Sequence, residues 1–192
     1  MSENKLFTYE QLTAYDSPRS LSSRLVQFSW NIVWALFCSW TPKPLNPWRI
    51  FWLRLFGSKI QGKPFVHGRA QIHLPWNLSL HDRACLASGA VAYSLGEVEL
   101  LERSTVAQEV YLCAATHKFD DLNLPLQVGK ITIGKDAFVG ARAFILPGIT
   151  VGEGSVIGAA SVVSEDVPPW VVAAGNPCKV LKPRIITEGK QL

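Results

Sequence analysis

Four histidines are the residues of this sequence best suited to proton transfer: His67, His73, His81 and His117. His117 differs from the other three because it ends the segment YLCAATH, just before residues 118–132, which we expect to form a loop. A neutral imidazole held beside such a loop can take a proton from a hydroxyl group near neutral pH. The alternative interpretation is a histidine at a corner of the chain, bonded to a nearby carbonyl group.

Other reactive side chains give weaker patterns. Cys113 lies four residues before His117. A catalytic cysteine–histidine pair is disfavoured because the two occupy different positions within one unit of the six-residue repeat described below. The histidines lack metal-ligand spacing, so we expect no metal, and a carbonic anhydrase, which needs three histidines converging on a metal, is disfavoured. A basic cluster near the C-terminus predicts either phosphate contacts for an anionic cofactor or a solvated tail: Lys179, Lys182 and Arg184.

The element that must position these residues is a six-residue repeat. β-Branched residues recur at every sixth position, mostly followed by glycine: Ile133, Val139, Ile145, Val151, Ile157 and Val163. This period fits neither a helix nor an alternating strand, but it is typical of a parallel β-helix in which three short faces make one turn. We expect the β-branched side chains to fill the bore, and the glycines to let the chain bend at the corners. Weaker repeats begin at Ile60 and extend the prediction to about five turns.

Breaks in the repeat divide the chain into three parts. We expect a helical cap, a β-helix interrupted by the loop 118–132, and a C-terminal tail, spanning residues 1–57, 58–170 and 171–192. Pro168 and Pro169 are predicted to end the last turn, because proline cannot continue a strand ladder.

The cap is predicted to contain two helices. The first covers residues 21–40, begins at Ser20 or Ser22, and carries an apolar stripe: Leu21, Leu25, Phe28, Ile32 and Leu36. The second ends at Gly57. The favoured interpretation is a cap packed on the first turn or on a neighbouring subunit. The alternative is peripheral membrane contact through residues 21–56, with tryptophans at headgroup level.

Composition narrows the partners and the compartment. The net charge of +4 is small and mostly dispersed, so nucleic acid is not an expected partner. The N-terminus lacks a basic region followed by an apolar core, and the four cysteines are scattered, which predicts a cytoplasmic protein with reduced thiols. The flat sides of a three-faced prism suggest a homotrimer.

Two regions carry a resemblance to a known family. YLCAATH together with ITIGKDAFVGARAFILPGITVGEGSVIGAASVVSEDVPPWVVAAGNPCKV resembles the hexapeptide-repeat O-acetyltransferases, such as the galactoside and maltose enzymes. YDSPRSL, LRLFGSKI and LPWNLSL further resemble the colanic-acid-biosynthesis acetyltransferases. The resemblance implies a left-handed β-helix trimer with active sites between subunits, acetyl-CoA as donor and a sugar hydroxyl as acceptor.

The same resemblance assigns expected roles to single residues. His117 matches the catalytic base, and Ala141 matches a position whose backbone N–H stabilises the oxyanion. Five further residues match cofactor contacts, besides Ala141 itself. They are an aromatic position, two positions along the pantetheine arm, and a basic pair facing the phosphates: Phe138, Ala159 with Ser164, and Lys179 with Lys182.

Departures from the family fall mainly on the acceptor side. Ser94 stands where the family has an acceptor-binding asparagine, and Glu165 replaces a lysine that contacts the cofactor. We expect Ser94 and Asp120 to face the acceptor, a cell-surface polysaccharide or its lipid-linked precursor. Asp120, Asp121 and Glu109 are alternatives for the group that orients His117. A catalytically silent scaffold is the alternative function.

Overall fold

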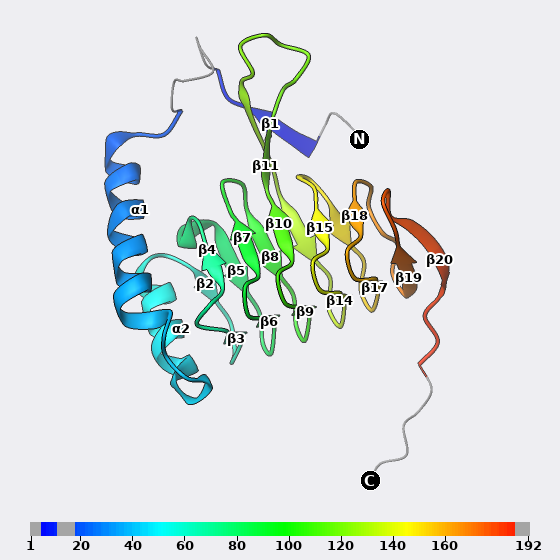
Figure 1. The fold of residues 1–192 in the computed structure, drawn as a ribbon, viewed down its shortest axis with the longest axis horizontal. Helices are drawn as coiled ribbons and strands as arrows, with labels where there is room; N and C mark the ends of the chain where they lie inside the picture. Colours follow the sequence, from blue (N-terminus) through cyan, green and yellow to red (C-terminus); the bar gives the residue numbers. More distant parts are fainter. Residues whose placement is uncertain (1–4, 11–17, 187–192) are drawn as a thin grey trace.

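The computed structural model describes residues 5–10 and 18–186 and shows a solenoid of short strands with helices against one end (Figure 1). Three mainly parallel sheets form its three faces. The first face contains β2 (Lys59–Ile60), β5 (Leu78–Leu80), β8 (Val98–Leu100), β13 (Ile131–Ile133) and β16 (Thr150–Val151). The second face contains β3 (Phe65–Val66), β6 (Cys85–Leu86), β9 (Thr105–Val106), β14 (Phe138–Val139), β17 (Val156–Ile157), β19 (Val171–Ala174) and β20 (Lys179–Pro183). The third face contains β4 (Gln71–Ile72), β7 (Val91–Tyr93), β10 (Tyr111–Cys113), β15 (Phe144–Ile145) and β18 (Val162–Val163).

The remaining elements lie outside this body. A three-stranded sheet contains β1 (Leu6–Thr8), β11 (Ala115–His117) and β12 (Leu126–Gly129). The helical elements are α1 (Leu21–Val33), the π-helical turn η2 (Trp34–Cys38), α2 (Asn46–Leu55), and the 3₁₀ turns η3 (Lys43–Leu45) and η4 (Pro75–Asn77). The expected class, a left-handed parallel β-helix with a helical cap, is confirmed.

The β-helix is longer than the sequence predicted. Five complete turns are followed by part of a sixth, in which Val167 bridges to Val151 and β19 pairs in parallel with β17. Pro168 and Pro169 occupy a corner of this turn and do not end it. Strand β20 then pairs antiparallel with β19, so most of the predicted tail belongs to the fold. The predicted loop 118–132 likewise includes β12 and part of β13.

The six-residue repeat fills the core as expected. All six β-branched repeat residues, from Ile133 to Val163, are at most 1% exposed. The glycines have a different role from the one predicted. A Cβ on Gly140 would lie 2.7 Å from the Ala159 nitrogen of the next turn, so glycine is needed for close packing of turns. The left-handed bend falls two residues later, at Arg142 (φ 61°).

Side chains of the cap form hydrogen bonds with backbone carbonyls at the open edge of the first turn. A terminal strand presents unpaired backbone groups that must find partners when buried. The Trp30 and Trp34 indole N–H groups donate to the Ile72 and Ala70 carbonyls at 2.7 and 2.9 Å. Arg49, which is fully buried, donates to the Val66 carbonyl at 2.7 Å. These bonds fix the helices on the β-helix.

Helix α1 docks through the face opposite to the one predicted. Ser20 caps it, as expected, by accepting from the Ser23 N–H. The predicted apolar stripe, however, points away from the body: Leu25 is 67% exposed and Phe28 is 63% exposed. The buried contacts come from Trp30 and Trp34 instead, because these two can both fill space and donate hydrogen bonds.

Candidate active site

A β-hairpin carries His117 away from the β-helix. After β10 the chain leaves the corner between the third and first faces and forms β11 and β12, with His117 opposite Leu126. Strand β1, near the N-terminus, adds to the outer edge of β12, with Phe7 opposite Val128. Figure 1 shows this small sheet rising from the body. Because β12 pairs with β1 on one side and with β11 on the other, the strand that carries His117 is held rigidly.

The imidazole of His117 is exposed and oriented by the backbone. Its Nδ1 lies 2.6 Å from the carbonyl oxygen of Leu124. A carbonyl only accepts, so Nδ1 carries a proton, and in the neutral imidazole Nε2 has a lone pair that no described residue uses. Leu124 has a left-handed backbone (φ 46°), and its N–H donates to the Asp121 carbonyl at 2.9 Å. This turn aims the Leu124 carbonyl at the imidazole.

Two of the three carboxylates considered for orienting His117 are engaged elsewhere. Asp121 accepts from the Asn123 N–H at 2.9 Å, which closes the tip of the hairpin. Glu109 accepts from Arg142 at 2.6 Å on the body of the β-helix. Asp120 is exposed at the hairpin tip, three residues from His117.

Ala141 and Ala159 stack at the corner between the second and third faces. The Ala160 N–H donates to the Ala141 carbonyl at 2.9 Å, so the two alanines lie one turn apart, about 4.8 Å. Within residues 5–10 and 18–186, neither alanine N–H finds an acceptor. Phe138 lies on β14 just before this corner and is 41% exposed. The corner therefore offers a column of free backbone donors beside an aromatic ring.

One protomer does not bring His117 and Ala141 together. The Arg142 N–H donates to the Gln108 carbonyl at 3.0 Å, which places Gln108 and Ala141 at the same corner. From Gln108 the chain must cross the third face through β10 before it reaches His117, nine residues further on. The two groups thus lie at opposite edges of the third face.

Ser164 lies on the same edge as the hairpin. It lines a pocket of about 270 Å³ together with Lys5, Pro147 and Glu165. Lys5 forms an ion pair with Asp166 at this pocket. Burial alone would raise the pKa of Asp166, but hydrogen bonds from Lys5 and from the Thr150 N–H outweigh it and lower that pKa.

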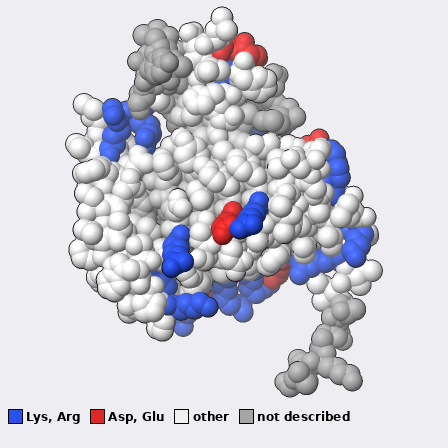
Figure 2. Space-filling view, in the orientation of Figure 1, with Lys and Arg blue, Asp and Glu red and all other residues white. Residues whose placement is uncertain are grey.

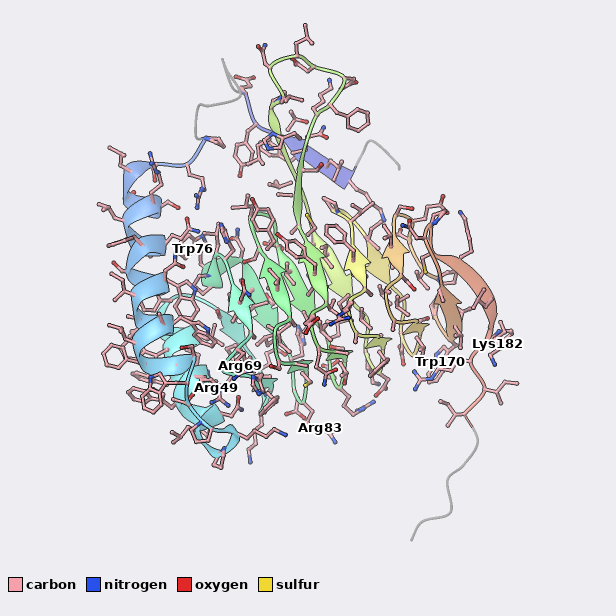
Figure 3. All side chains as sticks on the ribbon, viewed as in Figure 1. Arg49, Arg69, Trp76, Arg83, Trp170 and Lys182 are labelled. Atoms are coloured by element: carbon pink, nitrogen blue, oxygen red, sulfur yellow. The ribbon has the colours of Figure 1, made fainter. Side chains whose placement is uncertain are left out.

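The basic cluster separates into two kinds of side chain. Lys179 and Lys182 are exposed on β20, at the C-terminal end of the β-helix, where Figure 3 labels Lys182. The Lys179 Nζ lies 3.4 Å from Glu165. Arg184 instead donates to the Gly154 carbonyl at 2.6 Å and holds the end of the chain on the body. Of these three cations, Lys182 has no ion pair among the described residues and Lys179 has an exposed one, so the two lysines are the better placed to meet an anion.

Known proteins similar to this chain identify its family. A family model described as "Hexapeptide repeat of succinyl-transferase" matches residues 130–165. WcaF of Escherichia coli (strain K12), a protein named for acetyl transfer in colanic acid biosynthesis, is 36% identical over 163 residues, covering 85% of this chain and 89% of WcaF. The chain belongs to the hexapeptide-repeat acetyltransferase family.

Solved structures of hexapeptide-repeat acetyltransferases share the whole architecture. A maltose O-acetyltransferase from Clostridium difficile 630 superposes with a TM-score of 0.74 at 26% identity, covering 87% of this chain and 90% of its own. The acetyltransferase VCA0836 from Vibrio cholerae O1 biovar eltor, solved with acetyl coenzyme A, gives a TM-score of 0.80 at 18% identity, covering 90% and 94%. At this lower identity the likeness shows the fold alone.

Ser94, which was expected to face the acceptor, is buried in the structure. Ser94 is 0% exposed. Its hydroxyl donates to the Leu74 carbonyl and accepts from the Leu74 N–H, both at 2.9 Å. Both hydrogen-bonding functions are used to hold η4 against the third face. Ser94 is therefore structural, and Asp120 is the remaining acceptor-side candidate.

The other titratable groups are held apart from His117. Burial raises the pKa of the Cys113 thiol, which also donates to the Ala115 carbonyl at 3.0 Å, so it is a poor nucleophile. His81 contacts Glu99 at 3.1 Å on the first face, and His73 packs on Tyr93. Among the described residues, no three His, Cys, Asp or Glu side chains are placed to hold a metal ion.

Two contributors to the site were missed by the sequence reasoning. Leu124 acts through its backbone carbonyl, and an apolar residue in a short loop gives no sign of such a role. Lys5 reaches the pocket of Ser164 because β1 joins the hairpin. The alternation of apolar and polar residues around β1 is too short to predict a strand.

Proposed function

We propose that the protein transfers the acetyl group of acetyl-CoA to a sugar hydroxyl of a cell-surface polysaccharide or its lipid-linked precursor. The observation that carries this proposal is the free Nε2 of His117, held on a rigid hairpin by the Leu124 carbonyl. Membership of the acetyltransferase family and the sugar-related names of WcaF and the maltose enzyme support the donor and the acceptor class.

The proposed reaction is direct transfer. Nε2 of His117 takes the proton of the sugar hydroxyl as its oxygen attacks the thioester carbonyl carbon. The carbonyl oxygen gains negative charge and accepts from the Ala141 N–H. When the carbon–sulfur bond breaks, the departing CoA thiolate takes the proton from His117, which restores the neutral imidazole. No covalent enzyme intermediate is required.

The site is proposed to form between subunits of a homotrimer. His117 and Ser164 lie on one edge of the third face, and Ala141 and Ala159 lie on the other. A threefold ring would set the first edge of each protomer against the second edge of its neighbour, since a heterologous contact joins different surfaces. The separation of the two groups within one chain supports this arrangement.

Acetyl-CoA would lie along the groove between these edges. While the Ala141 N–H meets the thioester carbonyl, the Ala159 N–H would donate to a carbonyl oxygen of the pantetheine arm, with Phe138 beside the arm and Ser164 across the groove. The exposed ammonium groups of Lys179 and Lys182 suit the phosphates. When bound, acetyl-CoA supplies the activated acyl group.

Replacing Glu165 by glutamine should tighten CoA binding about threefold at low salt, because the substitution frees Lys179 from its carboxylate partner. Calorimetric titration with CoA measures this directly. Glu153→Gln, an exposed glutamate on the first-face side of the β-helix, is the matched control and should leave the dissociation constant unchanged. Weaker binding by Glu165→Gln would contradict the proposed phosphate contact.

The function is tested by release of CoA thiol from acetyl-CoA across a panel of sugars, oligosaccharides and glycolipids. We expect release with at least one carbohydrate, together with a product heavier by one acetyl group. A protein that neither turns over any acceptor nor binds CoA in calorimetry at millimolar concentration would instead be a silent scaffold.

A further inference from the structure

Helix α1 is apolar on two opposite sides. Its inner side packs Trp30 and Trp34 on the first turn of the β-helix. Its outer side, continued by η2, exposes large apolar side chains: Leu21 74%, Leu25 67%, Phe28 63%, Ile32 42% and Leu36 61%. An apolar side of a helix is normally covered by protein or lies against lipid. Within this protomer, nothing described covers the outer side.

The exposed surface continues across the connection to α2. It gains four more aromatic side chains: Phe37 46%, Trp40 69%, Trp48 40% and Phe51 51% exposed. Trp48 stacks on Phe51 and donates to the Phe37 carbonyl at 2.9 Å, so these rings are held in place by one another. An ordered apolar patch of this extent marks an interaction surface.

The charge around this patch has a single sign. The sequence contains no Asp or Glu from residue 17 to residue 81. Over the same stretch, exposed cations stand on the helical cap, namely Arg24 on α1, Lys43 in η3 and Arg54 on α2. Three more lie in the first turn of the β-helix: Lys59, Lys63 and Arg69. Figure 2 shows no red atoms over the flank formed by α1, and blue atoms at its two ends.

We propose that this surface, from Leu21 to Leu55, docks on a bilayer of anionic phospholipid. Tryptophan and phenylalanine side chains sit well at the level of the headgroups, and the cations would meet the lipid phosphates. No helix in the described part of the chain is long and apolar enough to cross a membrane, so the contact is interfacial. A second copy docking through the same patch would bring two cationic surfaces together, which disfavours that occupant.

Docking on a bilayer would bring the protein close to a lipid-linked acceptor, and it does not depend on catalysis. A protein held at the lipid surface would meet a lipid-linked glycan in two dimensions, which is consistent with the proposed function. Vesicle binding is measured without acetyl-CoA or acceptor. Failure of acetyl transfer and failure of membrane docking are therefore separate results.

The test is co-sedimentation of the full chain with vesicles of phosphatidylcholine, with and without phosphatidylglycerol. We expect binding to the anionic vesicles that weakens as salt is raised, because the cations contribute through screened attraction. The double variant Leu25→Glu with Phe28→Glu should reduce binding by about tenfold or more, since it removes two inserted side chains and adds repulsion.

The matched control places the same substitutions on the hairpin. Leu122→Glu with Phe119→Glu changes side chains that are 101% and 88% exposed and should leave vesicle binding unchanged. Circular dichroism and light scattering on both variants report fold and subunit number. The proposal is wrong if the unmodified protein does not bind anionic vesicles, or if both double variants bind as it does. It is also wrong if Leu25→Glu with Phe28→Glu dissociates the assembly, which would make the stripe a subunit interface.

Discussion

Replacing His117 by alanine is expected to lower kcat for acetyl transfer by about a thousandfold, the middle of the range for loss of a general base. The acceptor hydroxyl would then have to lose its proton to water as it attacks the thioester. The substitution leaves the Leu124 carbonyl without its donor, but this carbonyl lies in an exposed hairpin where water can replace the imidazole. Fold and CoA affinity should therefore change little.

Steady-state rates with acetyl-CoA and calorimetry with CoA separate the two effects. Lys118→Ala, the exposed neighbour of His117 on the hairpin, is the control and should keep kcat within about twofold, as expected for a surface substitution. If His117→Ala turns over at the rate of the unmodified enzyme, His117 is not the base.

Ala141→Pro is expected to lower kcat by about a hundredfold to a thousandfold, because proline has no N–H to stabilise the oxyanion. The β-helix accepts proline at this position of a turn. Ala141 stands three residues after the first residue of β14, and Pro147 stands three residues after the first residue of β15. Pro169 occupies the equivalent position at a third corner, where the following Trp170 N–H donates to the Glu153 carbonyl.

Ala141→Ser is the matched control because it keeps the backbone donor and the small side chain. It should retain kcat within about threefold, and both variants should unfold at similar temperatures. Equal losses in the proline and serine variants would show that the side chain of Ala141 matters and that its amide does not.

The β-helix was predictable because a period of six has few structural solutions. Every repeat residue from Ile133 to Val163 points into the bore, as its β-branched side chain suggested. The cap was less predictable. The stripe through Leu25 and Phe28 has the spacing of a buried helix face, yet Trp30 and Trp34 bind the body because their indole N–H groups donate to open carbonyls of the first turn, which an aliphatic side chain cannot do. Apolar residues at helical spacing indicate that one face of the helix is covered, but they do not identify the partner that covers it.

The candidate site rests on a resemblance that named His117 and Ala141 and implied a site between subunits. The structure adds that β10 separates these two residues within one chain. The sequence also offered carboxylates to orient the imidazole, whereas the structure uses the Leu124 carbonyl, which any residue in a left-handed turn could present. Ser94 was expected to face the acceptor, but its hydroxyl points inward and forms a hydrogen bond with the Leu74 backbone.

The central claim is that each active site joins His117 of one subunit to the Ala141 amide of a neighbour. The most direct test is activity of mixed trimers made by co-expressing His117→Ala and Ala141→Pro chains with different affinity tags. Each parent should be nearly inactive. Random assembly from equal amounts should place an intact His117 beside an intact Ala141 in about a quarter of the interfaces, and so restore about a quarter of the unmodified activity. Mixed assemblies that remain as inactive as the parents would contradict a site shared between subunits.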